Sequence, residues 1–583
     1  MFGKIVYISG SVAHIAIPEG TPVSMDLMNM YVVFEDGDRK VLGEVEDVSK
    51  TEIKIHFLGV IQDGNFIAGV LRKPTLESNI RMITEEELNL ITGVDEEGMF
   101  KLGQSPLYNK PIYVDINTLC SNHLAIFGNT GSGKSYTVAS FVQSMFYSPN
   151  FNPYRANYMI FDAYGEYHNA FERLGEVNPN YQFKYYTTNK EDKNGELISI
   201  PLWLLDIDDF ALLLNAEKHA QLEVIEKMIR MARIISLDSE DAIKYKNHII
   251  AKAILDTLYT NQTSASKRND IFTIIAGCST EQFNLEAPVQ GIGYVRKFRE
   301  CFTIDRSGEF AESVLITQYI TSFIDDSLDN YEAPNDHAFQ IDTLQKALNF
   351  TLISEGFLRN EQLYDDAMTL KVRLHSIAIS DCKDFFYYPN YVDLNGYIAS
   401  LVTKNSKKSQ IVNFNLEDTD DRMSKSLVKI YCKMLFQFTK HLNTRGAVPF
   451  HILLEESHRY VQNDNDNYLL GYNIFERIAK EGRKFGTILN LVSQRPVELS
   501  ETVISQISNF LILKMTHPRD LEYIKKMLPN MSEEIIDKQK SLQPGMCVAF
   551  GSAFKVPMII QMPLPNPAPH SSNVNVVSIW QGK

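Results

Sequence analysis

The octapeptide Gly128-Asn129-Thr130-Gly131-Ser132-Gly133-Lys134-Ser135 follows an apolar run at 123–127 and precedes a helical pattern that starts at Tyr136 and reaches 146. A phosphate-binding loop has this pattern between a strand and a helix. Its glycines let backbone N–H groups curl around phosphates, and the helix adds its positive end. We expect Lys134 to reach the β- and γ-phosphates of ATP, and Ser135 to offer a hydroxyl to Mg²⁺. The predicted nucleotide contacts are the whole loop and Tyr136; the alternative is a plain glycine-rich turn.

The composition indicates a soluble protein of several domains. Hydrophobic residues make up 44% of the 583 residues and charged residues 22%, and this length predicts about three or four compact units. No apolar run approaches the roughly 18 to 20 residues of a membrane span, so we expect a cytoplasmic protein with no membrane segment. The six cysteines lie far apart and predict reduced thiols. The net charge of −15 argues against a broad basic face, but leaves room for a local basic channel.

The hydrophobic pattern changes along the chain. Short β-type runs separated by turn signals predict a small barrel at the N-terminus, and apolar strands alternating with helices predict a mostly parallel sheet from Tyr108 on. An amphipathic helical stretch interrupts that α/β core, and a tail rich in Pro, Asn and Ser has too little apolar surface to form a core of its own. The predicted divisions are 1–83 (barrel), 84–102 (linker), 103–205 (core), 206–398 (helical insertion), 399–562 (core) and 563–583 (tail).

Two carboxylates, Glu455 and Glu456, end a strand-like run at 448–454. The carboxyl ends of strands form the ligand-binding edge of an open α/β sheet. We assign Glu455 to Mg²⁺ and Glu456 to polarising the water that attacks ATP. The alternative is a solvated acidic turn.

Three further segments point to the same edge. Gln494 follows the strand-like run 487–492 and is our candidate for sensing the γ-phosphate or orienting water. Arg483, a little upstream, could stabilise the charge of the transition state, or could be a simple surface cation. Because Arg483 is close to Gln494 in the sequence, we expect it to act within its own subunit. The segment 162–167 places Asp162 and Glu166 after a buried strand, where a plain Asp turn is nearly as plausible.

Together these segments resemble HerA-type ATPases of the FtsK–HerA superfamily. The ordered motifs are 128–135, 162–167, 455–458, 481–486 and 493–496, and the run 542–551 resembles the family's closing strand. The resemblance implies a RecA-like P-loop core and a homohexameric ring that hydrolyses ATP between subunits and moves double-stranded DNA through a central pore. It further implies an effector docked on the barrel, either a nuclease such as NurA in DNA end processing or an NAD-consuming or other enzyme in antiviral defence. An ATP-binding scaffold that activates such a partner with little DNA movement is the second hypothesis.

One feature departs from the family pattern. HerA-like proteins carry a trans-acting arginine upstream of the phosphate loop, whereas this chain has only Lys101 and Lys110 between Arg81 and Lys134. Arg155 and Arg445 are possible substitutes. For DNA, the small basic clusters 404–408 and 525–526 could contact phosphates, or could be solvated loops.

Overall fold

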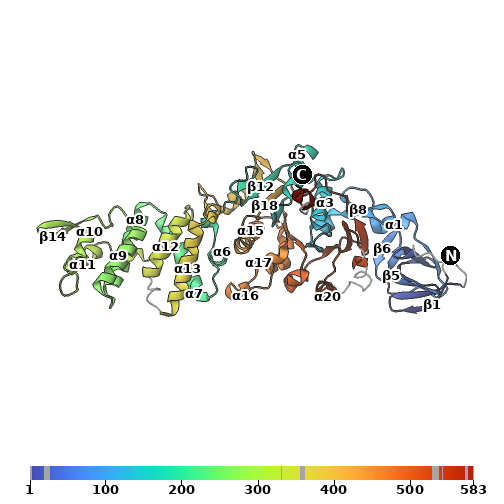
Figure 1. The fold of residues 1–583 in the computed structure, drawn as a ribbon, viewed down its shortest axis with the longest axis horizontal. Helices are drawn as coiled ribbons and strands as arrows, with labels where there is room; N and C mark the ends of the chain where they lie inside the picture. The colour runs from blue at the N-terminus through green and yellow to red at the C-terminus, as the bar shows by residue number, and fades with distance from the viewer. Residues whose placement is uncertain are drawn as a thin grey trace.

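The computed structural model describes residues 3–18, 27–329, 331–354, 361–527, 538–540, 542–571 and 576–581. The molecule is elongated, with an N-terminal β-sheet at one end, a large α/β core in the middle and a helical region at the other end (Figure 1). Among the described residues, no helix combines the length and the apolarity that a bilayer crossing requires.

The N-terminal unit is a seven-stranded antiparallel sheet with the order β1-β2-β5-β4-β3-β7, and β6 pairs with β5. Alternate residues of its long strand β5 are buried, as expected where one face covers a core. Among the described residues no pairing joins β7 to β1, so the strands form a half-barrel where the sequence predicts a small barrel. The strands are β1 (Lys4–Ser9), β2 (Val12–Ala16), β3 (Tyr31–Asp36), β4 (Arg39–Val48), β5 (Glu52–Gln62), β6 (Asn65–Ala68) and β7 (Asn79–Met82).

A short helix, α1 (Glu85–Thr92), joins this sheet to the core. Thr84 and Glu87 form a capping box at its start, and Glu87 also accepts hydrogen bonds from Arg81 and Lys40. The half-barrel and the core share one hydrophobic cluster. The two units are therefore packed together, so the predicted linker 84–102 is part of a folded junction.

The core is built on a 12-stranded sheet with the order β13-β12-β18-β11-β19-β20-β10-β21-β22-β23-β8-β9. Pairing is parallel from β13 to β21 and antiparallel beyond it. The predicted α/β class with a mostly parallel sheet is confirmed. Its strands are β8 (Met99–Ser105), β9 (Lys110–Asp115), β10 (Leu124–Phe127), β11 (Tyr158–Asp162), β12 (Phe183–Thr187), β13 (Glu196–Leu197), β18 (Ile411–Asn415), β19 (Phe450–Leu454), β20 (Thr487–Ser493), β21 (Asn509–Ile512), β22 (Met546–Gly551) and β23 (Met558–Gln561).

Both faces of the sheet are covered. Along β10, Leu124 and Ile126 belong to one hydrophobic cluster, while Ala125 and Phe127 belong to the other. Two long helices supply much of the cover: α3 (Lys134–Phe146) on the first face and α15 (Asp421–Lys440) on the second. This burial on both faces explains why the strands appear as continuous apolar runs.

The predicted insertion is mainly helical. It contains α6 (Ile207–Leu213), α7 (His219–Ile235), α8 (Glu240–Leu258), α9 (Ser264–Cys278), α10 (Phe298–Cys301), α11 (Ser313–Thr321), α12 (Ile341–Ser354), α13 (Glu361–Ile379) and α14 (Leu394–Leu401). Part of it has a hydrophobic core of its own. The sequence analysis missed the hairpin β14 (Pro288–Gly291) and β15 (Tyr294–Lys297), which projects at the far end (Figure 1).

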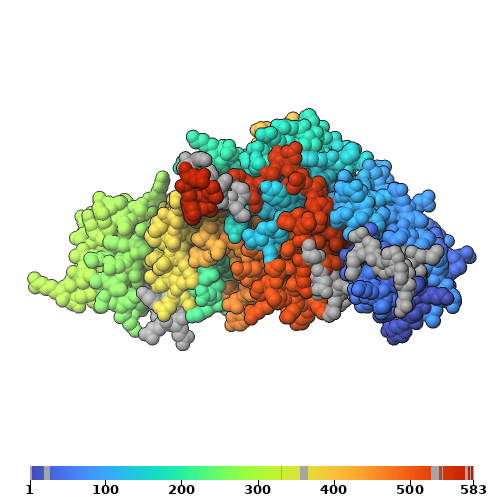
Figure 2. Space-filling view, turned by 45° about the vertical axis from the view of Figure 1, so that its right-hand side comes forward, coloured from blue at the N-terminus to red at the C-terminus, as the bar shows by residue number. Residues whose placement is uncertain are grey.

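The C-terminal residues return to the core after β23. Those in red cover cyan segments of the core in the space-filling view (Figure 2). Hydrogen bonds join residues 566–571 to α3 and to the loop after β11. A short helix, α22 (Val576–Trp580), follows.

Candidate nucleotide site

The phosphate loop lies between the central strand β10 and α3. Gly131 and Gly133 have φ angles of 78° and 90°, which L side chains rarely adopt. A Cβ at Gly133 would lie 2.9 Å from the backbone N of Gly545, in the turn before β22. The backbone N–H of Gly545 donates to the Ser132 carbonyl at 3.1 Å. The turn that leads into β22, the predicted closing strand, thus supports the phosphate loop. The loop fits a phosphate group because its backbone N–H groups form an anion-binding nest.

Lys134 is buried and faces the two predicted carboxylates. Its side chain is 8% exposed, and its Nζ lies 2.8 Å from Glu456 Oε1 and 3.8 Å from Glu455 Oε1. Burial alone would lower the pKa of Lys134, but the two carboxylates raise it above its ordinary value. The ammonium is therefore charged, as phosphate neutralisation requires.

Glu455 lies in a pocket that favours its neutral form. Burial raises its pKa to about 8, despite the neighbouring Lys134. Tyr167, on the loop after β11, donates its hydroxyl to Glu455 Oε2 at 2.6 Å. A divalent cation would offset the cost of burying the Glu455 charge, so this carboxylate and the Ser135 hydroxyl are suited to Mg²⁺.

Asp162 organises the loop that carries Tyr167. It accepts hydrogen bonds from the backbone N–H groups of Glu166 and Tyr167 and from the Asn413 amide. Burial raises its pKa to about 6. Asp162 therefore fixes the loop that places the Tyr167 hydroxyl against Glu455.

We expect Tyr167→Phe to raise the Mg²⁺ concentration that half-saturates nucleotide binding by about 10- to 100-fold, because removal of a group that orients a metal ligand has this effect. Titration of Mg²⁺ against a fluorescent ATP analogue measures it. Tyr164→Phe is the matched control, since Tyr164 lies in the same loop and is exposed. An unchanged Mg²⁺ requirement in Tyr167→Phe would contradict the assignment of Glu455 to the metal.

Glu456 has an unusual backbone, with φ 47° and ψ 47°. A left-handed residue other than glycine costs roughly 1–3 kcal/mol and is often found at functional sites. Burial would raise the pKa of Glu456, but His458, 3.2 Å away, and Lys134 hold it below its ordinary value. The side chain is thus an ionised carboxylate beside the phosphate loop, as a group that polarises water must be.

Gln494 lies at the same edge, directly after β20. Its Oε1 accepts a hydrogen bond from the Thr130 hydroxyl at 2.7 Å. The Asn129 side-chain amide of the loop donates a hydrogen bond to the Thr516 hydroxyl at 2.7 Å. Tyr136 is half-buried in the first turn of α3. The structure therefore brings together the phosphate loop, Glu455, Glu456 and Gln494.

Arg483 lies elsewhere, and the expectation that it stands near Gln494 is wrong. It precedes β20 whereas Gln494 follows it, and a strand of seven residues separates its two ends by roughly 20 Å. The Arg483 guanidinium donates to Ser508 Oγ, just before β21. Arg483 is thus at the opposite edge of the sheet from the phosphate loop, and the expectation that it acts beside Gln494 in the same chain does not fit this position.

Arg483 lines a cleft of about 980 Å³ at this opposite edge. Arg155 and Lys408 line it as well, and none of its lining residues is an aspartate or glutamate. The other proposed substitute, Arg445, lies over the Phe485 ring. The charged groups that line this cleft are therefore basic, whereas carboxylates lie beside the phosphate loop.

Two of the predicted DNA-contacting lysines have structural partners. Lys404 donates to the Phe183 carbonyl, and Lys408 donates to the Ala156 carbonyl and the Asn157 side chain. Burial lowers the pKa of Lys408 to about 8. Of the three lysines in this cluster, only Lys407 has an exposed side chain.

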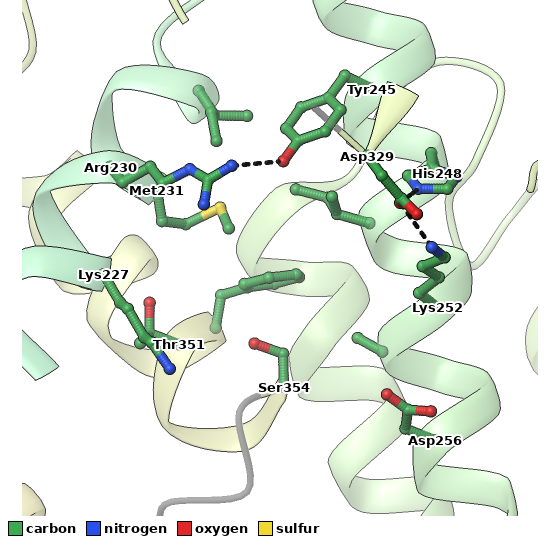
Figure 3. A pocket seen from close by; sticks show the side chains of 14 residues that line it. Lys227, Arg230, Met231, Tyr245, His248, Lys252, Asp256, Asp329, Thr351 and Ser354 are labelled. Atoms are coloured by element: carbon green, nitrogen blue, oxygen red, sulfur yellow. Dashed lines mark hydrogen bonds and ion pairs between the residues drawn. The ribbon is translucent and has the colours of Figure 1, made fainter. Parts of the chain in front are cut away.

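A pocket of about 220 Å³ in the helical insertion is also lined by basic groups (Figure 3). Its cations have partners: Lys252 pairs with Asp329, Arg230 donates to the Tyr245 hydroxyl, and Lys227 pairs with Glu223. His248 accepts from the Asp325 backbone N–H and contacts Asp329. These contacts hold the segment 325–329 against α8, which indicates that the charged groups of this pocket have a structural role.

The sequence analysis missed three contributors to the nucleotide site. Tyr167 ends the motif 162–167 and His458 ends the motif 455–458. Their closeness in sequence to the carboxylates of these motifs could have indicated a role in the site. Ser571, whose Oγ is 3.5 Å from that of Ser135, had no signal in the sequence.

The chain is similar to several known proteins. A family model described as the central domain of helicase HerA matches residues 100–280. The DNA double-strand break repair helicase HerA of Sulfurisphaera tokodaii is 24% identical over 582 residues, covering 94% of this chain and 91% of that protein. The protein of the same name from Saccharolobus solfataricus is 29% identical over 198 residues, 33% of this chain and 39% of that one. The structure of VirB4 of Thermoanaerobacter pseudethanolicus, 14% identical, has a TM-score of 0.46 and covers 81% of this chain and 97% of its own.

Proposed function

We propose that this chain, a HerA-type P-loop ATPase, is a subunit of a cytoplasmic homohexameric ring that hydrolyses ATP to move double-stranded DNA through its central pore. The observation that carries the proposal is the meeting of the phosphate loop with Glu455 and Glu456 at one edge of the sheet. In the proposed reaction Lys134 neutralises the β- and γ-phosphates and Glu456 polarises the attacking water. Mg²⁺, held by Ser135 and Glu455, would offset charge on the phosphates.

The two edges of the sheet support a ring. One edge carries the nucleotide site with its carboxylates, and the opposite edge carries Arg483, Arg155 and Lys408 without a lining carboxylate. Identical subunits that meet head to tail bring these unlike edges together, and such contacts generate rings when the rotation closes. In that arrangement, Arg483 serves the site of the next subunit.

Mixing variants tests this role of Arg483. We expect Arg483→Ala and Glu456→Gln each to lose turnover, and an equal mixture to recover part of it, because about a quarter of head-to-tail interfaces then combine an intact Glu456 with an intact Arg483. Steady-state ATP hydrolysis after subunit exchange measures the recovery. Lys484→Ala, an exposed neighbour, should keep wild-type turnover, and a mixture that recovers nothing would argue against a trans role.

The half-barrel is the proposed docking face for an effector, a nuclease such as NurA or an NAD-consuming enzyme. It exposes large apolar side chains, including Tyr7, Ile67 and Leu71. These side chains would offer apolar contacts to a bound effector.

Stimulation by DNA tests the proposed function directly. Turnover by the purified protein, alone and with its effector, should rise when linear double-stranded DNA is added and should not rise with a neutral polymer. The alternative function, an ATP-binding scaffold for the effector, predicts turnover that is indifferent to DNA while effector activity still requires ATP. That second result would overturn the translocase proposal.

A further inference from the structure

The C-terminal segment 565–571, here called the strap, lies against α3 and against the residues that follow β11, next to the nucleotide site. Prolines occupy alternate positions in 563–569, and proline favours extended backbone without hydrogen bonds of its own. Pro565 and Pro569 are nevertheless buried. The strap is therefore an extended segment held by contacts with the rest of the protein.

Gln143 makes the most specific of these contacts. It lies on α3, about two turns beyond Ser135, and its side chain is buried among polar partners. Its Oε1 accepts from the Asn566 backbone N–H at 2.9 Å, and its Nε2 donates to the Pro567 carbonyl at 2.8 Å and the Ala170 carbonyl at 2.9 Å. A buried amide is costly when its hydrogen bonds are unmade, so Gln143 fixes the register of the strap against α3.

The strap has a second attachment, on the loop that follows β11 and on the short helix α4 (His168–Phe171) after it. Asn169 donates to the Ala568 carbonyl at 2.7 Å, and the His570 backbone N–H donates to the Glu166 carbonyl at 2.7 Å. This loop includes Tyr167, which holds Glu455. The strap thus ties the helix that carries Ser135 to the loop that orients Glu455.

These attachments bring the end of the strap to the metal side of the site. The Ser571 Oγ lies 3.5 Å from the Ser135 Oγ. Ser135 is the hydroxyl of the phosphate loop suited to Mg²⁺, and Glu455 is the carboxylate suited to it. The strap therefore spans the two sides of one proposed metal site.

We propose that the strap is a positioning element for magnesium–nucleotide binding, in which Gln143 sets its register and Ser571 orients the Ser135 hydroxyl. The inference rests on the proposed ATPase function and adds a role for the C-terminal segment. Its removal should weaken nucleotide binding more than it slows the chemical step, because it acts on the placement of ligands and leaves Glu456 and Lys134 in place.

Two variants test the strap in the full-length protein. Gln143→Met keeps the length and burial of the side chain but loses its three hydrogen bonds, and Ser571→Ala loses only the hydroxyl. We expect both to raise the KM for magnesium–ATP and the Kd of a fluorescent ATP analogue by about 10-fold, the lower end for groups behind a metal ligand, with a smaller change in kcat. Gln506→Met, an exposed glutamine, should leave both constants unchanged.

Hydrogen exchange provides a readout independent of turnover. Adding magnesium and the ATP analogue to the wild-type protein should slow amide exchange in residues 566–571, and Gln143→Met should remove this protection. If Gln143→Met does not fold, Ser571→Ala and the wild-type exchange pattern still decide the question.

The outcomes separate the two proposals. Wild-type nucleotide constants in both variants, with exchange of the strap indifferent to nucleotide, would overturn the role of the strap and leave the ATPase intact. A wild-type protein that neither binds nor hydrolyses ATP would overturn the proposed function, and the role of the strap with it.

Discussion

Lys134→Ala should abolish measurable ATP hydrolysis. The substitution removes the ammonium that neutralises the β- and γ-phosphates, and no other cation lies within ion-pair distance of Glu455 or Glu456 among the described residues except His458 when protonated. Steady-state turnover at saturating magnesium–ATP measures the loss. Lys101→Ala, an exposed lysine on β8, should keep wild-type turnover.

The same variant should remain folded but lose some stability. The sequence alone suggested that a loop lysine contributes little to the core, yet Lys134 is buried against two carboxylates. Breaking a buried pair costs about 3–5 kcal/mol when a charge is stranded. The stranded charge would be that of Glu456, the carboxylate nearest Lys134, and Glu456 keeps His458 Nδ1 as a partner at 3.2 Å, so we expect a loss below this range. Wild-type turnover in Lys134→Ala would refute the site, whereas a lower unfolding temperature would not.

Glu456→Gln should separate binding from hydrolysis. The amide keeps the size of the side chain but does not accept a proton from water, so turnover should fall by about two orders of magnitude or more while ATP still binds. Rapid-quench hydrolysis and a filter-binding assay on one preparation measure the two quantities. Glu501→Gln, an exposed glutamate, is the control.

Loss of ATP binding in Glu456→Gln, with normal hydrolysis per bound nucleotide, would make Glu456 a binding residue. Glu455 would then be the candidate for polarising water. The geometry favours the first assignment, because Glu456 is held ionised whereas burial drives Glu455 towards its neutral form.

The sequence predicted the nucleotide site best where a local sequence motif directly follows a strand and therefore lies at the carboxyl edge of the sheet. A strand followed by a glycine-rich loop has few alternative structures, and carboxylates that follow a parallel strand must reach its carboxyl edge. For this reason the phosphate loop, Glu455, Glu456 and Gln494 meet as expected. The apolar runs at 123–127, 448–454 and 487–492 correspond to the strands β10, β19 and β20.

The residues that the sequence analysis placed wrongly have a common physical cause. Arg483 is only eleven residues from Gln494 in the chain, but a strand between them carries the chain across the sheet, so nearness in sequence became distance in space. Lys404 and Lys408 show the same limit, since their partners are backbone carbonyls more than 200 residues away. The tail was predicted only to lack a core of its own, and nothing local in its sequence shows that Gln143 receives it.

The placement of Arg483 and the phosphate loop at opposite ends of β20 has a consequence for enzyme assays. If Arg483 serves the next subunit, an isolated subunit carries one part of each of two different active sites and the whole of neither. Specific activity, which is independent of enzyme concentration for a self-contained ATPase, would then fall on dilution as neighbours separate, and would return on concentration. Turnover per subunit, followed across a dilution series beside light scattering, would therefore report the association of subunits.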